Sequence, residues 1–290
     1  MWLKTQNVSE RLPRSSRDNA PDSRPRAAGT QSGRPRTALI TGASSGIGRE
    51  IARLLAEDHF NLVLVARDHE RLLTISAELE SRHGITATPI VKDLSSPDAS
   101  LEILSEIRRR SLPVDVLVNN AGFAVGGNFA CADMAQTIAL LNVNVVALTQ
   151  LSRLLLPGML ARQWGRILNV ASIAGFYPGP LTACYNASKA FVVNFSLALS
   201  NELHGTGVTA TCLCPGPTQT RFAQRANLIG ARAFSEGVMA ATPVARIGYK
   251  AMMTGRTMAV AGWRNKLRML PIPLVPSRIL SHFSRKYHEV

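Results

Sequence analysis

A serine, a tyrosine and a lysine lie close together in the stretch SIAGFYPGPLTACYNASKAF, which runs from Ser172 to Phe191. Tyr185 and Lys189 are four residues apart, so on a helix they share one face. A phenol with a reference pKa of about 10 is a poor base at neutral pH, and a nearby ammonium lowers that pKa. Ser172 adds a hydroxyl that can hold a substrate oxygen. The three residues predict proton transfer at the oxygen of a carbonyl or an alcohol, although the Tyr–Lys pair alone would also suit an ordinary half-exposed helix.

Seven short apolar runs alternate with longer helical patterns and must position these residues. The runs lie at 37–41, 61–66, 85–91, 115–119, 165–172, 207–215 and 257–262. Continuous apolar strands separated by helices predict a parallel sheet that is covered on both faces. The predicted fold class is therefore α/β, a doubly wound Rossmann-type sheet of about seven strands with helices on both faces. Such sheets bind ligands outside the carboxyl ends of their strands.

A glycine-rich turn, TGASSGIG, follows the first strand directly and opens the first helix. In this context the glycines allow a tight turn and a close approach of the backbone, and the helix N-terminus faces a pyrophosphate. The turn therefore predicts a dinucleotide cofactor. The residues assigned to it are Gly42, Ser44, Ser45, Gly46, Ile47 and Gly48.

The second strand ends in VLVAR, with Ala66 where NAD-binding folds usually carry an acid for the ribose hydroxyls. Arg67 follows at once, and a guanidinium can bind a 2′-phosphate that an acid would repel. We therefore predict NADP(H), the reduced form being NADPH, rather than NAD as the cofactor. The alternative is that Arg67 is only a solvated residue at the edge of a loop.

The third and fourth strands end in polar or small residues that we also assign to the cofactor site. Asp93, followed by Leu94, can accept a hydrogen bond from the adenine amino group. After the fourth strand comes NNAG, in which Asn120 can bind the ribose or the neighbouring loop. The small Ala121 and Gly122 allow the backbone to lie close to a ligand. Turn chemistry alone would explain these residues too, but their positions at strand ends favour a cofactor site.

Two asparagines, Asn142 and Asn144, interrupt an apolar helical segment from Asp133 to Ala161. Asparagine is a poor residue for a helix interior, and a buried asparagine must find hydrogen-bond partners. One of the two is therefore expected to face a polar pocket. Their spacing alone does not choose between them.

From Thr37 to about Thr220 the chain resembles the short-chain dehydrogenase/reductase family, in its single-domain branch. The matching motifs, in order, are TGASSGIG, NNAG, NVNVVALTQ…LLLPGM, GRILNVAS, YNASK and CPGPTQT. The resemblance implies that Tyr185 is the acid/base and that Ser172 orients the carbonyl. It implies that Lys189 lowers the pKa of the tyrosine and holds the nicotinamide ribose, so that Tyr185 and Lys189 also belong to the cofactor contacts.

The same resemblance implies further site residues. In this family an asparagine lies thirteen residues before the proline that ends the fifth helix. Counting back from Pro157 selects Asn144. The resemblance implies that Asn144 holds a water relay to the lysine. The long helices at 133–160 and 183–204 imply a homodimer or homotetramer. The loop PGPTQT would contact the nicotinamide amide, which assigns Pro215, Gly216, Thr218 and Thr220 to the cofactor.

The net charge of +14 is concentrated at the two ends of the 290-residue chain. Residues 1–36 carry +5 and have a polar, Arg-, Ser- and Pro-rich composition, which predicts a disordered basic arm. Residues 246–290 carry +8, whereas the residues between these two segments carry only +1. A nucleic-acid-binding protein would show a basic stripe on its folded domain. We therefore expect no nucleic-acid partner, and we assign the NADP-binding catalytic domain to 37–262.

Within this domain, residues 221–256 are assigned to the region of the substrate lid. The apolar, Ala-rich composition of this region predicts an apolar carbonyl or alcohol substrate, and so do the apolar residues near the site, Phe123, Val125, Phe129, Phe176 and Tyr177. Ordinary loop packing is an equally good explanation. The extension at 263–290 mixes basic and large apolar residues. Its docking onto the domain or a neighbouring subunit is favoured over binding to a membrane surface.

The predicted protein is a metal-free, NADPH-dependent oxidoreductase that interconverts a carbonyl and a secondary alcohol, chiefly in the reducing direction. A start without an apolar signal segment, and four cysteines expected to be buried thiols, predict a cytoplasmic location. The alternative is a redox sensor or scaffold that binds NADP without turnover. The intact set of Ser172, Tyr185 and Lys189 argues against that alternative, because a sensor does not need all three.

Overall fold

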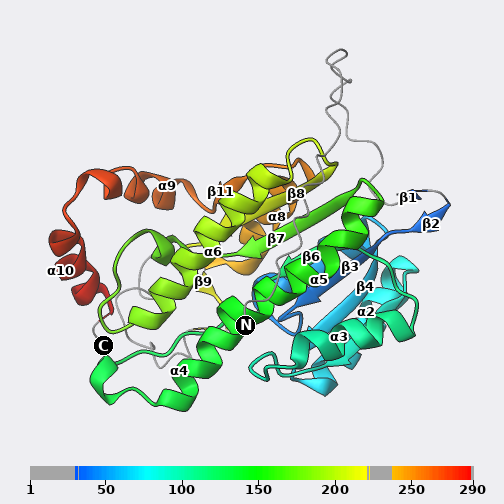
Figure 1. Ribbon diagram of the computed structural model, residues 1–290, viewed down its shortest axis with the longest axis horizontal. Coiled ribbons are helices and arrows are strands. Elements are labelled where there is room, and N and C mark those ends of the chain that lie inside the picture. Colours follow the sequence, from blue (N-terminus) through cyan, green and yellow to red (C-terminus); the bar gives the residue numbers. More distant parts are fainter. Residues whose placement is uncertain (1–29, 32, 221, 223–236, 289–290) are drawn as a thin grey trace, which may run out of the picture.

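The computed structural model describes residues 30–31, 33–220, 222 and 237–288. At its centre lie seven parallel strands in the order β11-β8-β7-β6-β3-β4-β5 (Figure 1). The chain builds outward from β3 to β5 and then crosses to β6 on the other side of β3, so the predicted doubly wound sheet is confirmed. The strands are β3 (Thr37–Thr41), β4 (Asn61–Ala66), β5 (Ala87–Val91), β6 (Val114–Asn119), β7 (Gly165–Val170), β8 (Val208–Cys214) and β11 (Met258–Val260).

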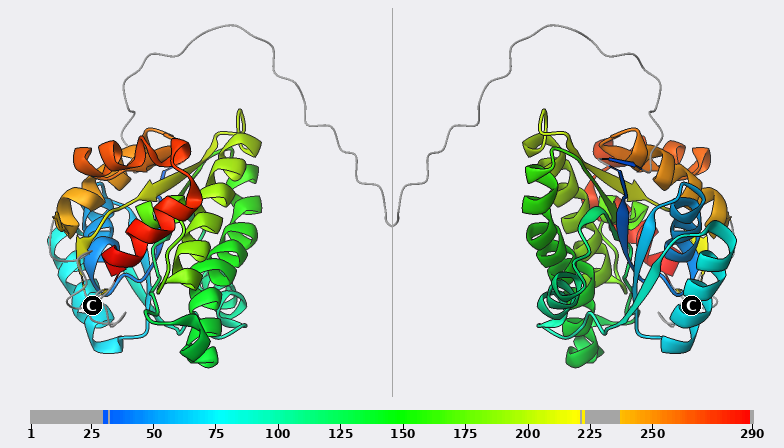
Figure 2. Two further views of the ribbon diagram at one scale, coloured as in Figure 1. Left: turned by 90° about the vertical axis from the view of Figure 1, so that its left-hand side faces the viewer. Right: turned by 90° about the vertical axis from the view of Figure 1, so that its right-hand side faces the viewer.

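Helices cover both faces of the sheet, and Figure 2 shows the sheet between the two layers. Successive side chains of a strand point to opposite faces, so Ala38 and Ile40 pack in one core and Leu39 in the other. The core of Ala38 and Ile40 includes the buried faces of α1 (Gly46–Glu57), α2 (His69–His83) and α8 (Ala241–Met253). The core of Leu39 includes those of α3 (Ala99–Arg109), α5 (Leu148–Ala161) and α6 (Ala183–Glu202).

One continuous helix joins α4 (Met134–Leu141) through a wider, π-helical turn, η2 (Asn142–Ala147), to α5. It continues through Pro157 to Ala161, so the expectation that this proline ends the helix is wrong. By length and composition alone it could cross a bilayer, with a mean hydropathy of 1.5 in its most apolar window. However, α5 packs against β6 and β7, as a core helix does.

The folded part of the chain begins before position 37. The short strands β1 (Thr30–Gln31) and β2 (Arg34–Pro35) pair with each other. Arg34 donates two hydrogen bonds of 3.1 Å to the buried carboxylate of Asp115 in β6. The end of the predicted arm, 1–36, is therefore attached to the domain, where Arg34 and Arg162 together pair with the buried Asp115 carboxylate. The rest of the arm lies outside the described residues.

The second half of the predicted lid, 221–256, is largely part of the fold. Strand β10 (Met239–Ala240) pairs with β9 (Thr218–Gln219), and α8 packs against α1 with Val244 and Met252 fully buried. Helix α8 therefore covers the sheet rather than the substrate. The first half of the predicted lid lies outside the described residues, except for Phe222.

The C-terminal extension forms α9 (Trp263–Met269), a short turn η5 (Ile272–Leu274) and α10 (Ser277–His288). Figure 1 shows it beyond the carboxyl ends of the strands. Asn265 is buried against Gly216, where a Cβ would come within 2.4 Å of the asparagine amide. Ser284 of α10 is buried as well. The extension thus docks onto the domain through Asn265.

Candidate active site

A cavity of about 270 Å³ lies at the carboxyl ends of the strands, as the rule for doubly wound sheets predicts. Of the site residues predicted from the sequence, only Gly48 and Asn144 do not line it. The predicted residues that do line it are Gly42, Ser44, Ser45, Gly46, Ile47, Arg67, Asp93, Leu94, Asn120, Ala121, Gly122, Ser172, Tyr185, Lys189, Pro215, Gly216, Thr218 and Thr220.

The glycine-rich turn is packed too tightly for side chains. Gly42 and Gly46 have φ values of +65° and +58°, in the left-handed region that favours glycine. A Cβ on Gly42 would lie 2.7 Å from Nδ2 of Asn120, and one on Gly46 would lie 2.7 Å from Cγ2 of Thr220. A Cβ on Gly48 would lie 2.4 Å from the same Asn120 nitrogen. Gly48 therefore serves the packing of the helix, while Gly42 and Gly46 also form the wall of the cavity.

The N-terminus of α1, at the wall of this cavity, has no capping side chain. Its N-cap, Ser45, makes no side-chain cap hydrogen bond, and its first turn contains no acid. In contrast, Asp68 caps α2 and Asp133 caps α4. The first N–H groups of a helix need acceptors and carry the positive end of its dipole. The uncapped end beside Gly46 therefore fits the pyrophosphate of a dinucleotide.

Asn120 holds the glycine-rich turn in place. Its Nδ2 donates to the carbonyl oxygens of Thr41 (2.9 Å) and Gly42 (3.2 Å). The hydroxyl of Thr41 in turn accepts hydrogen bonds from the backbone N–H groups of Asn120 and Ala121. Of the two roles open to Asn120, the structure therefore shows the contact with the neighbouring loop. Thr41 has the same role and was missed in the sequence, because its partners lie almost 80 residues away.

Arg67 and Asp93 meet across the ends of β4 and β5. The guanidinium lies 3.6 Å from Oδ2 of Asp93, and both side chains are largely exposed at the rim of the cavity. Burial acts to raise the pKa of Asp93, but hydrogen bonds from Ser95 and the charge of Arg67 outweigh it and hold the pKa below its usual range. This end of the cavity therefore offers a carboxylate acceptor beside an Arg67 guanidinium that can bind a phosphate.

Ser172 lies where β7 ends and connects two loops of the site. Its Oγ accepts a hydrogen bond from the backbone N–H of Ala174, at the start of η3 (Ile173–Phe176). The same oxygen lies 3.4 Å from the carbonyl oxygen of Pro215. The hydroxyl is thus held by the loops after β7 and β8 and lines the cavity.

Tyr185 and Lys189 lie one turn apart on α6, as predicted. Burial raises the pKa of Tyr185 to about 12, although a hydrogen bond with Ser172 acts to lower it. Burial also lowers the pKa of Lys189 to about 8, while the neighbouring Cys212 and Cys214 act to raise it. Burial is the largest effect on the tyrosine pKa here, and the lowering of that pKa by Lys189 stays a prediction. The ammonium nitrogen lies 5.9 Å from the centre of the ring and donates to the carbonyl oxygen of Val170 at 2.8 Å.

The two cysteines beside Lys189 are buried, as expected for thiols in the core. Cys212 and Cys214 alternate with Leu213 on β8, and their sulfur atoms are 3.6 Å apart. Cys184 is half-buried, whereas Cys131 is exposed, so the prediction of four buried thiols is wrong for Cys131. Within the described ranges, no three His, Cys, Asp or Glu side chains gather as a metal site would require.

Asn144 joins the long helix to the site, whereas Asn142 does not. The Asn144 amide accepts from the N–H of Phe123 and donates to its carbonyl oxygen and to Oγ of Ser188. A Cβ on Gly122 would lie 3.1 Å from Oδ1 of Asn144 and 3.3 Å from Nζ of Lys189. Gly122 therefore leaves space for both polar groups.

Asn142 binds the carbonyl oxygen of Ser95 instead. Both asparagines lie in the π-helical turn η2, and such turns frequently occur at functional sites. The structure thus distinguishes two residues that spacing alone could not.

Asn186, which the sequence analysis missed, fixes the loop that follows Ser172. Its Nδ2 donates to the carbonyl oxygens of Ala174 and Tyr177, and its Oδ1 accepts from the Thr182 hydroxyl. Asn186 follows Tyr185 directly and is fully buried. The only signal in the sequence is an asparagine inside an apolar helix, the same signal that marked Asn142 and Asn144.

The substrate side of the cavity has apolar and aromatic walls. Phe123 and Tyr177 line it as predicted, together with Ile173 and Phe222. The rings of Tyr185 and Phe222 are 5.3 Å apart. Phe176 instead packs on the core, and Phe129 is exposed on η1 (Phe129–Cys131), so neither forms the wall.

Comparison with known families agrees with this geometry. The sequence model described as short chain dehydrogenase matches residues 36–228. The chain therefore belongs to the short-chain dehydrogenase family and has the nucleotide-binding Rossmann fold of that family.

Two relatives and one solved structure illustrate the similarity. The ketoacyl reductase HetN of Nostoc sp. is 37% identical over 181 residues, which are 62% of this chain and 63% of HetN. A probable NADP-dependent dehydrogenase of Haemophilus influenzae is also 37% identical over 181 residues, or 62% of this chain and 70% of that protein. A short-chain dehydrogenase from Sphingobium yanoikuyae in complex with NADPH has a TM-score of 0.74 at 30% identity, covering 80% of this chain and 90% of that one. The chain spans less than two thirds of the length of HetN.

Proposed function

We propose that this protein is an NADPH-dependent reductase that converts an apolar carbonyl compound into a secondary alcohol. The proposal depends chiefly on one observation. Ser172, Tyr185 and Lys189 line a single cavity together with the glycine-rich turn and an uncapped helix N-terminus. The similar chains named for NADP or solved with NADPH support the choice of cofactor.

The reaction needs a hydride for the carbonyl carbon and a proton for the carbonyl oxygen. Bound NADPH would supply the hydride. Ser172 would hold the carbonyl oxygen by a hydrogen bond, and the Tyr185 phenol would give it the proton. A tyrosine pKa of about 12 keeps the phenol protonated at neutral pH, which favours its action as an acid and hence the reducing direction. The Lys189 ammonium would then stabilise the phenolate that is left.

The chain offers a residue for each part of the cofactor. The uncapped N-terminus of α1 would bind the pyrophosphate, and Arg67 would bind the 2′-phosphate. Asp93 would accept from the adenine amino group. Lys189 would hold the nicotinamide ribose, and the loop from Pro215 to Thr220 would contact the nicotinamide amide.

The substrate class is inferred from the walls of the cavity. Phe123, Ile173, Tyr177 and Phe222 present apolar surface beside Tyr185. The name of HetN, a ketoacyl reductase, suggests that a 3-oxoacyl chain is the first compound to try. Apolar walls bind a chain of this kind through the surface that it buries.

A homodimer or homotetramer in the cytoplasm is part of the same proposal. Ile138, Val146 and Phe191 are exposed on the long helices expected to pair between subunits. Large apolar side chains exposed on such helices are available for a contact between subunits.

The test is oxidation of NADPH with a panel of carbonyl compounds. The panel holds 3-oxoacyl thioesters of increasing chain length, a bulky aromatic ketone and a short polar sugar ketone. We expect turnover of the apolar compounds and its loss in Tyr185→Phe. Turnover of the sugar ketone alone would contradict the substrate class. Binding of NADPH without any turnover would favour the sensor or scaffold instead.

A further inference from the structure

The C-terminal extension exposes large apolar side chains although α9 is attached to the domain and α10 has a buried serine. Trp263, Leu270 and Leu274 are 67%, 70% and 86% exposed. Their exposure does not reflect a detached segment, because Asn265 and Ser284 are buried. The tail surface, as we call it, consists of Trp263, Leu267, Leu270, Leu274, Ile279 and Phe283.

The spacing of these residues follows the helices that carry them. On α9, Trp263 and Leu267 are one turn apart, and on α10 Ile279 and Phe283 are one turn apart. Residues at such spacing share one face of a helix. Asn265, on another side of α9, lies against Gly216 and donates to the carbonyl oxygen of Ala261. The docked side of α9 is therefore the one that carries Asn265 and the half-buried Met269, whereas Trp263 and Leu267 are exposed within the described residues.

Positive charge accompanies the tail surface. Arg264, Lys266 and Arg278 are exposed among its apolar residues, and the sequence has no Asp or Glu from 237 to 288. The Arg264 guanidinium lies 5.5 Å from the centre of the Trp263 ring. Basic helices with Trp, Phe and Leu on an exposed face are suited to the interface of a bilayer, where anionic headgroups attract the charges.

We propose that the tail surface binds the surface of an anionic lipid bilayer. Charge complementarity decides between this partner and a second copy of the chain. A two-fold contact places the same patch of each copy against the other, and would bring two basic tails together. The remainder of the folded domain, at +1 for residues 37–245, has no acidic excess to attract a basic tail. An anionic bilayer offers both the opposite charge and an apolar layer.

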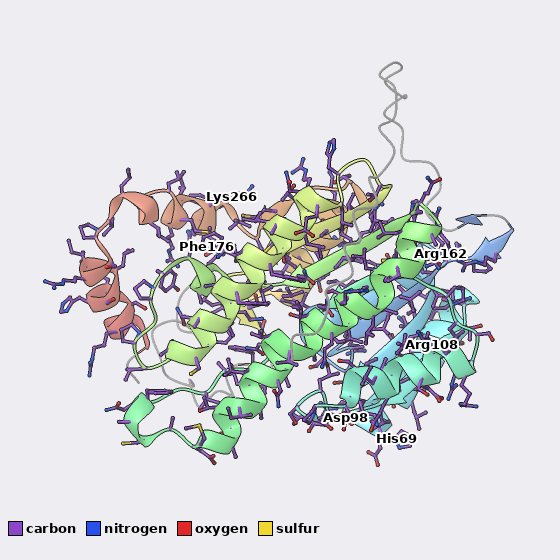
Figure 3. The ribbon with its side chains drawn as sticks, viewed as in Figure 1. His69, Asp98, Arg108, Arg162, Phe176 and Lys266 are labelled. Carbon is purple, nitrogen blue, oxygen red and sulfur yellow. The ribbon has the colours of Figure 1, made fainter. Side chains whose placement is uncertain are left out.

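The position of the tail surface gives this contact a consequence for the site. Figure 1 shows α10 on the side of the molecule where the strands end, and the left view of Figure 2 shows α10 in front of the sheet. Helix α9 contacts η3, where Figure 3 shows Phe176 close to Lys266. The bilayer would therefore lie on the cavity side of the molecule, from which an apolar substrate can enter.

The experiment is co-sedimentation of the full chain with vesicles. One set contains phosphatidylcholine alone, and the other contains phosphatidylcholine with phosphatidylglycerol. We expect binding to the anionic vesicles at low salt and its loss at high salt, because salt screens the charges. The double substitution Leu270→Ser/Leu274→Ser should weaken binding about tenfold or more, since each leucine buries apolar surface in the bilayer.

A second variant tests the charges. Arg264→Gln/Lys266→Gln/Arg278→Gln should weaken binding to anionic vesicles by about fivefold for each charge removed. The matched control, Leu101→Ser/Arg108→Gln, changes an exposed leucine and an exposed arginine on α3, which Figure 3 shows far from Lys266. This control should bind as the wild type does.

Three results would overturn the proposal. One is the absence of binding to anionic vesicles at low salt. Another is binding that the tail variants leave unchanged, which would assign it to a different part of the chain, such as the basic arm. The third is that the protein forms a dimer without lipid and that Leu270→Ser/Leu274→Ser dissociates this dimer. The tail surface would then be a contact between two copies of the chain. Tryptophan emission supplies a second measurement, because anionic vesicles should shift it to the blue in the wild type and much less in Trp263→Phe.

Discussion

The catalytic cavity and the C-terminal tail arrange their side chains in opposite ways. Around the cavity, Asn144, Asn186 and Lys189 are only 1%, 3% and 5% exposed, and each has hydrogen-bond partners. In the tail, Leu270 and Leu274 are 70% and 86% exposed. A buried polar group is costly unless it is paired, and an apolar group is costly in water unless it is covered. The cavity satisfies its polar groups within the chain, whereas the tail leaves its apolar groups for a partner.

The largest effect is expected from the lysine of the cavity. Lys189→Met should lower kcat/KM for reduction by about 10²–10⁴-fold, the usual contribution of acid–base assistance. Its thermal stability should change little, because removing a buried ammonium offsets the loss of the hydrogen bond to the carbonyl oxygen of Val170. Lys250→Met, at an exposed lysine of α8, is the matched control. A stable Lys189→Met variant with full activity would contradict the assigned role.

The next effect tests whether buried polar groups stabilise the cavity. Asn186→Ala should lower the free energy of unfolding by about 2–3 kcal/mol, since it leaves buried carbonyl oxygens without a donor. Asn194→Ala removes an exposed asparagine from the same helix, one that donates only to Ala190. Urea unfolding should show a change of no more than about 0.5 kcal/mol for this control. Equal losses in the free energy of unfolding would contradict the claim that buried amides stabilise the protein more than exposed ones.

An intermediate effect is expected at the rim of the cavity, where Arg67 is charged but largely exposed. Arg67→Ala should weaken NADPH binding by about tenfold and leave NADH binding nearly unchanged, because only NADPH carries the 2′-phosphate. Fluorescence titration with both cofactors measures the ratio of the NADPH and NADH dissociation constants. Equal affinities in the wild type would show that Arg67 is a surface charge and that the predicted cofactor is wrong.

The smallest effect is expected in the tail. Leu274→Ser should change the free energy of unfolding by less than about 0.5 kcal/mol, because a side chain that is 86% exposed contributes little to folding. Leu267→Ser provides a second exposed position on α9. A loss of more than about 1 kcal/mol at Leu274 would mean that the tail packs within the protein, and the comparison with the cavity would fail.

The sequence predicted the residues that act through local spacing. Tyr185 and Lys189 share one helix turn, and each other motif lies at the carboxyl end of its own strand, so the fold class brings them to one edge of the sheet. The buried hydrogen-bond network of the core could not be predicted from local spacing. Asn119 in β6 donates to Asn169 in β7, which donates to Ser196 in α6, and these partners are 50 and 27 residues apart.

What the sequence could not predict depended on burial, which one sequence does not show. The raised pKa of Tyr185 comes from its burial. Similarly, the apolar pattern of residues 241–253 suits a substrate lid as well as a helix that covers the sheet. Only the packing of this segment against α1 shows that it is a covering helix. In the tail, the composition of α9 did not tell which side docks, because that depends on the fit of Asn265 against Gly216.

The pH dependence of reduction tests most directly the claim that a protonated phenol and a buried ammonium act together. The pKa of Lys189, lowered to about 8, predicts that kcat/KM for NADPH is constant below about pH 8 and falls above it as the ammonium loses its proton. Tyr185 remains protonated throughout this range. In Lys189→Arg, whose guanidinium keeps its charge, the fall near pH 8 should disappear. A kcat/KM that rises through this range would contradict the account, because the reaction would then require a group that has lost its proton.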